Sequence, residues 1–214
     1  MFPIAEVADN IVTAWDQNLS VHLPGEEVGT VVEERALGFL AELLGFKKGG
    51  EEWKGRTFTT GATAANILGL ACGREVVIGH RLQAKGEKRG VGELGLLRAC
   101  IDAGVKEVQV LTSMGHSSLY KAASVVGIGR ASVKDIGRKD GRPWMVDLNV
   151  LKTELERAKD GVVSIVALSA GEVNTGRFAT GGLEEMKSIR ALCDEYGAWL
   201  HVDGGKSWIS PLLT

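Results

Sequence analysis

The sequence predicts an α/β fold, in which a mainly parallel sheet is flanked by helices on both faces. Strand-like patterns alternate with helical patterns of about a dozen residues over most of the chain, as parallel strands with helical crossovers require. The segment Val162–Leu168 is a continuous apolar, β-branched run, which is typical of a strand buried on both faces. Polar, glycine-containing stretches follow several predicted strands, where such sheets bind ligands.

Composition places the chain among ordinary globular proteins. Its 214 residues are 44% hydrophobic and 24% charged, with a formal net charge of −2. This balance gives no reason to expect a nucleic-acid partner, and no apolar run is long enough to cross a membrane. The start of the chain lacks a signal-peptide pattern, and the three cysteines are too few and scattered for a disulfide framework. We therefore expect a cytoplasmic protein.

The first part of the chain is predicted to be an appendage to the main domain. Residues 1–25 are apolar and aromatic without a clear period, which indicates a loop-rich opening. A helical pattern covers 26–44, with Glu26 and Glu27 at its start and Gly45 at its end. A polar linker follows at 47–55, so we expect a helical segment over 1–55 and the main domain over 56–214.

The main domain is predicted to alternate strands and helices. Strands are expected at 57–60, 106–111, 132–136, 162–168 and 198–203. Helices are expected from Gly61 onward, then over 93–103, from the stretch 114–118 to about 126, over 148–159 and over 182–196, with Asp147 capping the fourth of these. No internal repeat and no low-complexity tract interrupts this order.

The final strand carries the strongest candidate for a ligand-binding side chain. Alternation places Leu200 and Val202 on one face and Trp199, His201 and Asp203 on the other. An acidic residue at the carboxyl end of an apolar strand lies where open α/β sheets bind ligands, and the following glycines permit close approach of the backbone. A turn or capping aspartate is an equally good interpretation of Asp203 by itself.

Three other segments could meet this aspartate. Gly61, Ala62 and Thr63 open a helix and so offer unpaired N–H groups to an anion, although a threonine there could simply be the N-cap. His116 follows a strand and precedes a helix, where it could cap that helix, transfer a proton or lie on a planar ligand. The glycine-flanked loop that contains Asn174 follows the buried strand and is either a ligand loop or a turn.

Several other site types are excluded. No Gly-x-Ser-x-Gly motif supports a serine hydrolase. The stretch Gly205–Ser207 copies the end of a phosphate-binding loop, but Leu200 occupies the place of its first glycine and Pro211 breaks the helix that should follow. The four histidines have no metal-ligand spacing, so no metal site is expected.

Taken in order, these motifs resemble the pyridoxal-phosphate-dependent (group II) amino-acid decarboxylases, most closely the fungal and bacterial pyridoxal-dependent decarboxylase branch. The likeness covers nearly the whole chain. It rests on the segments Trp15–Asn18, Thr59–Asn66, Gly115–Ala122, Ala170–Gly176 and His201–Gly204. The resemblance implies the three-layer α/β/α large domain of fold-type I enzymes, a decarboxylase that acts on an L-amino acid, and pyridoxal 5'-phosphate as cofactor.

The resemblance also implies roles for matching positions. Gly61, Ala62 and Thr63 match the phosphate-binding segment, and His116 matches the histidine that stacks on the pyridine ring. Asp203 matches the carboxylate that pairs with the pyridine nitrogen, and His116 and Asp203 are therefore the catalytic candidates. Asn174 lies in the loop that faces the cofactor, and Gly205 lies where a small residue flanks the ring.

The chain also departs from the family pattern. Family members carry a His-Lys pair some tens of residues beyond the aspartate, and that lysine holds the cofactor covalently, whereas this chain ends at Thr214. Lys206 is too close to Asp203 to be assumed its substitute. The chain thus resembles most of a large domain cut at both ends, and we expect little decarboxylation by these 214 residues alone.

Two other roles stay open beside the decarboxylase. The resemblance implies a homodimer for the complete protein, so this chain could be a non-catalytic fragment or paralogue that associates with a full-length subunit. Another fold-type I enzyme, such as an aminotransferase or a lyase, would share the stacking residue and the aspartate. The context Gly115–Ser118 favours the decarboxylase.

Overall fold

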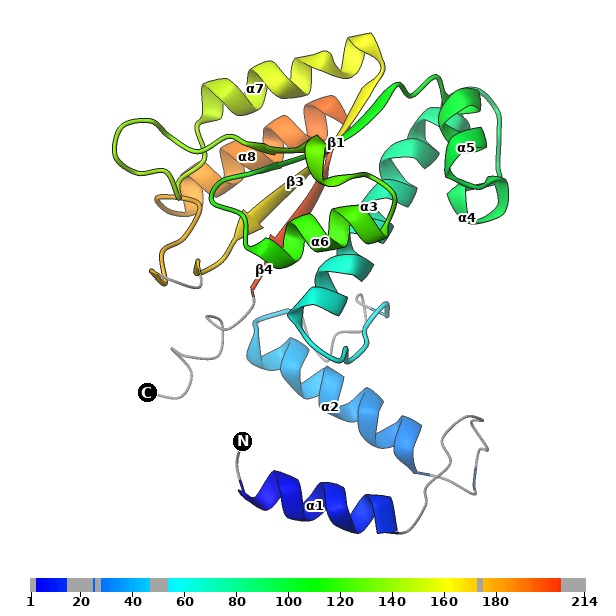
Figure 1. Ribbon diagram of the computed structural model, residues 1–214, viewed down its shortest axis with the longest axis vertical. Coiled ribbons are helices and arrows are strands. Elements are labelled where there is room, and N and C mark those ends of the chain that lie inside the picture. Colours follow the sequence, from blue (N-terminus) through cyan, green and yellow to red (C-terminus); the bar gives the residue numbers. More distant parts are fainter. Residues whose placement is uncertain (1–2, 15–24, 26–27, 47–53, 173–174, 205–214) are drawn as a thin grey trace. The chain divides into compact units, whose positions relative to one another are not determined.

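The structure is a computed structural model that describes residues 3–14, 25, 28–46, 54–172 and 175–204. The chain divides into two compact units, Met1–Phe58 and Thr59–Thr214. Figure 1 shows both units, with most of their helices and strands labelled.

The first unit contains two helices, α1 (Pro3–Ala14) and α2 (Gly29–Leu43). The loop expected over residues 1–25 is wrong for Pro3–Ala14, because Ile4, Val7 and Ile11 recur at helical spacing, a period that the sequence interpretation missed. The α2 helix lies within the predicted range 26–44. It is followed by Gly45 at a φ of +76°, the left-handed conformation that commonly ends a helix.

The second unit is built on a parallel sheet, as predicted. Its four strands are β1 (Glu107–Thr112), β2 (Val133–Asp135), β3 (Val162–Ser169) and β4 (Trp199–Asp203). They lie in the order β2-β1-β3-β4, and every neighbouring pair is parallel. Ser169 at the end of β3 is in register with Asp203 at the end of β4, so both carboxyl ends meet at one edge of the sheet.

Helices precede β1 and connect the four strands. They are α3 (Ala62–Ala84), α4 (Val91–Leu94), α5 (Leu96–Ala103), α6 (Ser117–Val125), α7 (Leu148–Glu156) and α8 (Leu183–Tyr196). Short 3₁₀ turns occupy Arg130–Ser132 and Arg157–Asp160. The helix expected over 93–103 is interrupted at Gly95, whose φ is +75°. The strand expected at Thr57–Thr60 is wrong, because these residues form no strand pairing, and α3 begins directly after them.

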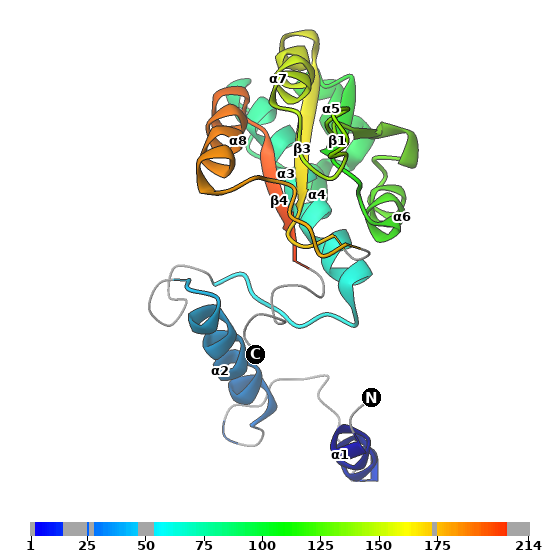
Figure 2. The same cartoon turned by 90° about the vertical axis from the view of Figure 1, so that its left-hand side faces the viewer.

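The helices cover the two faces of the sheet, as Figure 2 shows for α6 and α8. Ile165 and Ala167 of β3 pack with α3 and α6, whereas the alternating Val166 and Leu168 pack with α7 and α8. A third buried cluster packs the later part of α3 against α4, α5 and Val163. This alternation, with both sets of side chains buried, explains why β3 is apolar throughout its length.

Two glycines let α3 lie close against β4. A Cβ atom on Gly73 would stand 2.6 Å from Cδ1 of Trp199, and one on Gly69 would overlap the ring of His201. Gly69 and Gly73 are four residues apart on the helix, and Trp199 and His201 are two apart on the strand, so each residue pair lies on one face of its element. The predicted grouping of Trp199, His201 and Asp203 on one face of β4 is therefore confirmed.

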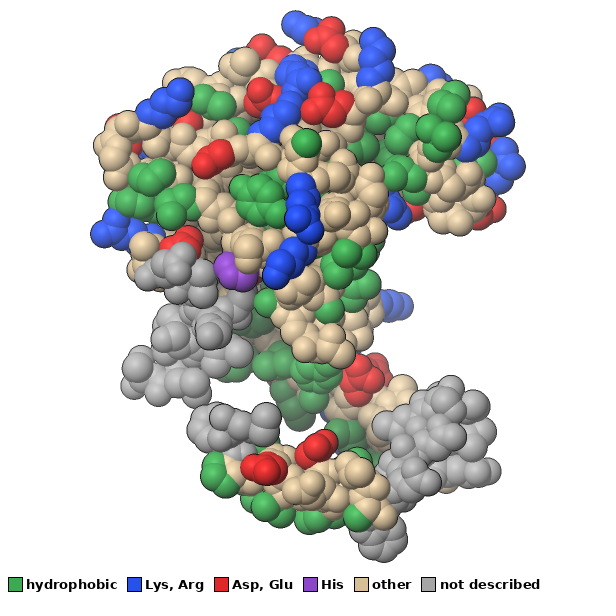
Figure 3. Space-filling model, viewed as in Figure 1, with side chains coloured by type: hydrophobic (Ala, Val, Ile, Leu, Met, Phe, Trp, Pro, Cys, Tyr) green, Lys and Arg blue, Asp and Glu red, His purple; other side chains and the backbone are tan. Residues whose placement is uncertain are grey.

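The surface carries both signs of charge. On the face drawn in Figure 3, the Lys and Arg side chains of the second unit are interspersed with Asp and Glu. Among the described residues, no helix combines the length and the apolarity needed to cross a membrane.

Candidate functional site

The candidate site lies at the carboxyl edge of the sheet in the second unit. There the end of β4 supplies Asp203, the first turns of α3 supply Thr63 and Asn66, and the start of α6 supplies His116 and Ser118. Residues that lie 52 to 137 positions apart in the chain are joined here by hydrogen bonds.

Asn66 is the centre of this group. Its side chain is 2% exposed and uses both ends of its amide. Nδ2 lies 2.9 Å from Oδ2 of Asp203 and 3.1 Å from Oγ of Ser118. Oδ1 lies 2.8 Å from Nε2 of His201. A buried amide whose polar atoms are all paired is held in one orientation, so Asn66 fixes the neighbours that it contacts.

His116 is both the N-cap of α6 and a member of this network. Its φ of −62° and ψ of 149° are extended, and its Nδ1 accepts a hydrogen bond from the backbone N–H of Ser118 at 3.2 Å. The same Nδ1 lies 2.8 Å from Oγ of Ser118. The capping interpretation of His116 is therefore correct, and it leaves Nε2 on the other side of the ring, away from the cap.

Burial keeps His201 neutral. Removal from water lowers the pKa of its imidazole below the ordinary value of 6.5, although the nearby carboxylate of Asp203 acts in the opposite direction. The neutral ring packs over Gly69 and donates from Nε2 to the amide oxygen of Asn66. His201 thus supports the network from within the helix–sheet interface.

This pKa shift predicts a pH dependence of stability. A histidine whose pKa is lower in the folded state binds its proton more weakly there than in the unfolded chain. The free energy of unfolding is therefore highest above the unfolded pKa of about 6.5 and decreases as the pH falls below it. We expect the urea midpoint to fall between about pH 7.5 and pH 5.5, and the fall to be smaller in His201→Gln. His80→Gln, at an exposed position on α3, should retain the wild-type dependence. An unchanged pH dependence in His201→Gln would contradict the assignment.

The first turn of α3 lies one turn before Asn66. Gly61 is its N-cap and makes no side-chain cap bond, so neither Thr60 nor Thr63 has the capping role that the sequence left open. Gly61, Ala62 and Thr63 are exposed, and Asn66 follows Thr63 by three residues on the same helix face. Backbone N–H groups of a first turn have no partners within the helix and can bind an anion.

The loop after β3 reaches the same edge of the sheet. The N–H of Ala170 donates to the carbonyl of Asp203 at 2.9 Å. Buried Glu172 accepts hydrogen bonds from the backbone N–H of Thr175 at 2.9 Å and from its hydroxyl at 3.0 Å. The predicted site residues Asn174 and Gly205, and the neighbouring Lys206, lie outside the described residues.

The structure therefore brings three of the predicted segments together. Asp203, the first turns of α3 and His116 are joined through Asn66 and Ser118. Asn66, Ser118 and His201 lie within the sequence motifs, but those motifs alone assign no role to these three residues. A signal was present: Asn66 is a large polar residue among the small and apolar residues that surround it, on the same helix face as Gly69 and Gly73.

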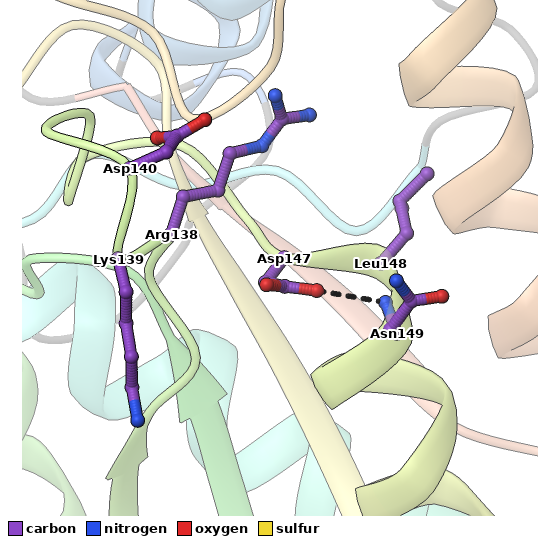
Figure 4. A pocket seen from close by; sticks show the side chains of 6 residues that line it. All are labelled: Arg138, Lys139, Asp140, Asp147, Leu148 and Asn149. Atoms are coloured by element: carbon purple, nitrogen blue, oxygen red, sulfur yellow. Dashed lines mark hydrogen bonds between the residues drawn. The ribbon is translucent and has the colours of Figure 1, made fainter.

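A hollow lies elsewhere on the second unit. Its volume is about 660 Å³, and its lining consists of Arg138, Lys139, Asp140, Asp147, Leu148 and Asn149, as Figure 4 shows. None of these is a predicted site residue. Three of its charged groups are already engaged, since Arg138 pairs with Glu185, Asp140 pairs with Arg142, and Asp147 caps α7. Within the described part of the chain, no cluster of three or more His, Cys, Asp or Glu side chains could hold a metal ion.

Comparison with known proteins identifies the family of the chain. Residues 13–213 match the family described as "Pyridoxal-dependent decarboxylase conserved domain". L-2,4-diaminobutyrate decarboxylase of Acinetobacter baumannii is 27% identical over 100% of this chain and 38% of its own length. Aspartate 1-decarboxylase of Aliivibrio fischeri is 28% identical over 94% of this chain and 37% of its own length. The chain thus spans less than two fifths of these relatives.

Solved structures show the same fold. The glutamate decarboxylase domain of a Vibrio parahaemolyticus diaminobutyrate-pyruvate transaminase and L-2,4-diaminobutyrate decarboxylase superposes with a TM-score of 0.70. Its identity is 22%, over 95% of this chain and 40% of that one. Mouse CSAD gives 0.65 at 20% identity, over 92% and 36% respectively. The family match covers nearly the whole chain, and on that evidence the protein belongs to the pyridoxal-dependent decarboxylases.

Proposed function

We propose that the complete protein is a pyridoxal-phosphate-dependent carboxy-lyase that acts on an L-amino acid in the cytoplasm, and that residues 56–214 form most of its cofactor-binding domain. The observation that carries this proposal is the hydrogen-bonded group that joins Asp203, Asn66, Ser118 and His116 at the carboxyl edge of the sheet. The carboxylate, the amide, the hydroxyl and the imidazole of this group suit a flat, anionic ring that contains a nitrogen atom.

Asp203 supplies the negative charge for the ring nitrogen. A carboxylate beside a pyridine nitrogen raises the affinity of that nitrogen for a proton, because opposite charges attract strongly where little water is present. The amide of Asn66 holds one carboxylate oxygen, Oδ2, and so orients the group. A protonated ring draws electrons from the bond that is broken in the substrate, and this is the chemistry that the bound cofactor would contribute.

His116 and the start of α3 hold the rest of the group. The imidazole of His116 is proposed to lie on the face of the ring, oriented by the two hydrogen bonds to its Nδ1. The exposed first turn at Gly61, Ala62 and Thr63 is proposed to bind the phosphate through backbone N–H groups and the Thr63 hydroxyl. Asn174 and Gly205 complete the proposed set of cofactor-binding residues.

Cofactor binding by this chain is the direct test. We expect pyridoxal 5'-phosphate to bind the 214-residue protein reversibly, with a dissociation constant measured from the change in its absorbance. Pyridoxal without the phosphate is the matched ligand control and should bind at least about tenfold more weakly, since it cannot use the charge-assisted bonds at the start of α3. Equal binding of the two ligands, or no binding of either, would contradict the proposed site.

A second role concerns association between subunits. The α1 helix has no buried residue, and Ile4, Val7 and Ile11 are each more than half exposed. We propose that the complete protein is a homodimer and that this chain can associate with a full-length subunit through apolar surface of this kind. Sedimentation of the chain with a full-length decarboxylase of the same organism tests the second role, and independent sedimentation of the two would contradict it.

A further inference from the structure

The network around Asn66 has a defined hydrogen-bond direction. An amide oxygen only accepts, so the 2.8 Å contact between Oδ1 of Asn66 and Nε2 of His201 requires the hydrogen on Nε2. The opposite amide orientation would bring Oδ1 to 2.9 Å from the carboxylate oxygen of Asp203, with two acceptors facing each other. The NH₂ group of Asn66 therefore donates one hydrogen to Asp203 and the other to Ser118.

The same direction continues to His116. Oγ of Ser118 accepts from Asn66, so its own hydrogen is available for Nδ1 of His116 at 2.8 Å. The backbone N–H of Ser118 also donates to that nitrogen. Because Nδ1 meets two donors, it carries no hydrogen, and the hydrogen of the neutral ring is on Nε2.

From this arrangement we propose that Asn66 is a positioning residue that couples the orientation of the Asp203 carboxylate to the tautomer of His116, with Ser118 as the link. This inference rests on the proposed function, because the coupling would serve to orient both side chains for the cofactor. Asn66 would hold the carboxylate of Asp203 for the ring nitrogen, while His116 presents a neutral ring with Nε2–H. A neutral imidazole avoids placing a second positive charge beside a protonated pyridine.

The coupling explains why three elements meet here. Asn66 comes from α3, Asp203 from β4, and Ser118 and His116 from the start of α6. Asn66 and Ser118 are 2% and 3% exposed, so their hydrogen bonds are shielded from competing water. Loss of either side chain should therefore be felt at His116, whereas only loss of Asn66 should be felt at Asp203.

The first test needs no cofactor. In protein labelled with ¹⁵N at histidine, the ring nitrogen shifts should report His116 as the Nε2–H tautomer. We expect Ser118→Ala and Asn66→Leu each to move the tautomer ratio about threefold to tenfold toward Nδ1–H, the effect of one lost hydrogen bond. Asn149→Leu, an exposed site on α7, is the matched control and should leave the ratio unchanged. Wild-type tautomer ratios in both Ser118→Ala and Asn66→Leu would overturn the inference.

The second test compares the effects of Asn66 and Ser118 on cofactor binding. We expect Asn66→Leu to raise the dissociation constant of pyridoxal 5'-phosphate about tenfold, whereas Ser118→Ala raises it about threefold or less, because only the first removes a hydrogen bond to the Asp203 carboxylate. The double variant should bind like Asn66→Leu alone, since both changes break one chain of contacts. Equal losses that add in the double variant would overturn the coupling.

The outcomes distinguish the inference from the function on which it rests. If wild type fails to bind pyridoxal 5'-phosphate but the histidine tautomers change as expected, the proposed function fails and the network stands. If wild type binds the cofactor and the tautomers do not change, the proposed function stands and the inference fails. Should Asn66→Leu lose its native circular dichroism, the milder Ser118→Ala decides the tautomer question.

Discussion

Replacing Asp203 by alanine is expected to have the largest effect on the proposed chemistry. In this chain we expect the dissociation constant of pyridoxal 5'-phosphate to rise about 10- to 100-fold, since a hydrogen bond to a charged group contributes about 1.5–3 kcal/mol. In the complete protein, decarboxylation should fall by about two to three orders of magnitude, a loss typical of removing one preorganised charge from a transition state. Titration by absorbance and carbon dioxide release measure the two effects.

Asp194→Ala is the matched control for Asp203→Ala. Asp194 is an exposed aspartate on α8 that pairs with Arg190 at 2.6 Å, and it lies outside the network around Asn66. The control should bind the cofactor like wild type and lose at most about 0.5 kcal/mol of stability, as expected for an exposed ion pair. Near wild-type affinity and activity in Asp203→Ala would exclude the proposed role of this carboxylate.

Replacing Gly69 by alanine is expected to give the second large effect, on stability and on the site together. The new methyl group would overlap the ring of His201, which the amide of Asn66 holds from the other side. Overpacking of this kind costs about 1–3 kcal/mol in the free energy of unfolding. Because the ring must move, the tautomer and cofactor readouts of the network should also change. Urea unfolding and histidine NMR spectra measure both.

Gly79→Ala tests whether the effect of Gly69→Ala on stability comes from the position of the added methyl group or from replacing glycine by alanine in this helix. Gly79 lies on the same helix, and a Cβ atom there would meet nothing within 4 Å. Alanine at an open helix position is favoured over glycine by about 0.5–1 kcal/mol, so Gly79→Ala should stabilise the protein. The two substitutions are therefore expected to have opposite signs. If Gly69→Ala also stabilised the protein, the close packing of α3 on β4 would be wrong.

The sheet could be predicted because its signals are local. A run of apolar, β-branched residues such as Val162–Leu168, or the alternation around Val108, specifies a strand through side-chain period alone. The helix that starts at Ser117 and the cap at Asp147 follow from residue types at element ends. These same local signals placed Asp203 at the carboxyl end of the last strand.

Other features depend on contacts that a local pattern does not contain. Thr57–Thr60 has strand-forming residues but pairs with no strand among the residues that the structure describes, so its propensity is not realised. The role of Asn66 depends on Ser118 and Asp203, which are 52 and 137 residues away along the chain. Only the folded arrangement of α3, α6 and β4 shows that one amide serves both partners.

The pairing of Ser169 with Asp203 makes strand register a requirement for the proposed cofactor site as well as for folding. A shift of β4 by one residue would exchange its two faces. Val202 or Gly204 would then occupy the present place of the carboxylate, and Asp203 would face the helices on the other side of the sheet. A sheet in this shifted register could retain much of its hydrogen bonding and yet lack the proposed cofactor site. The turn at Gly197, whose φ is +64°, precedes β4 and therefore helps to fix the register of this strand.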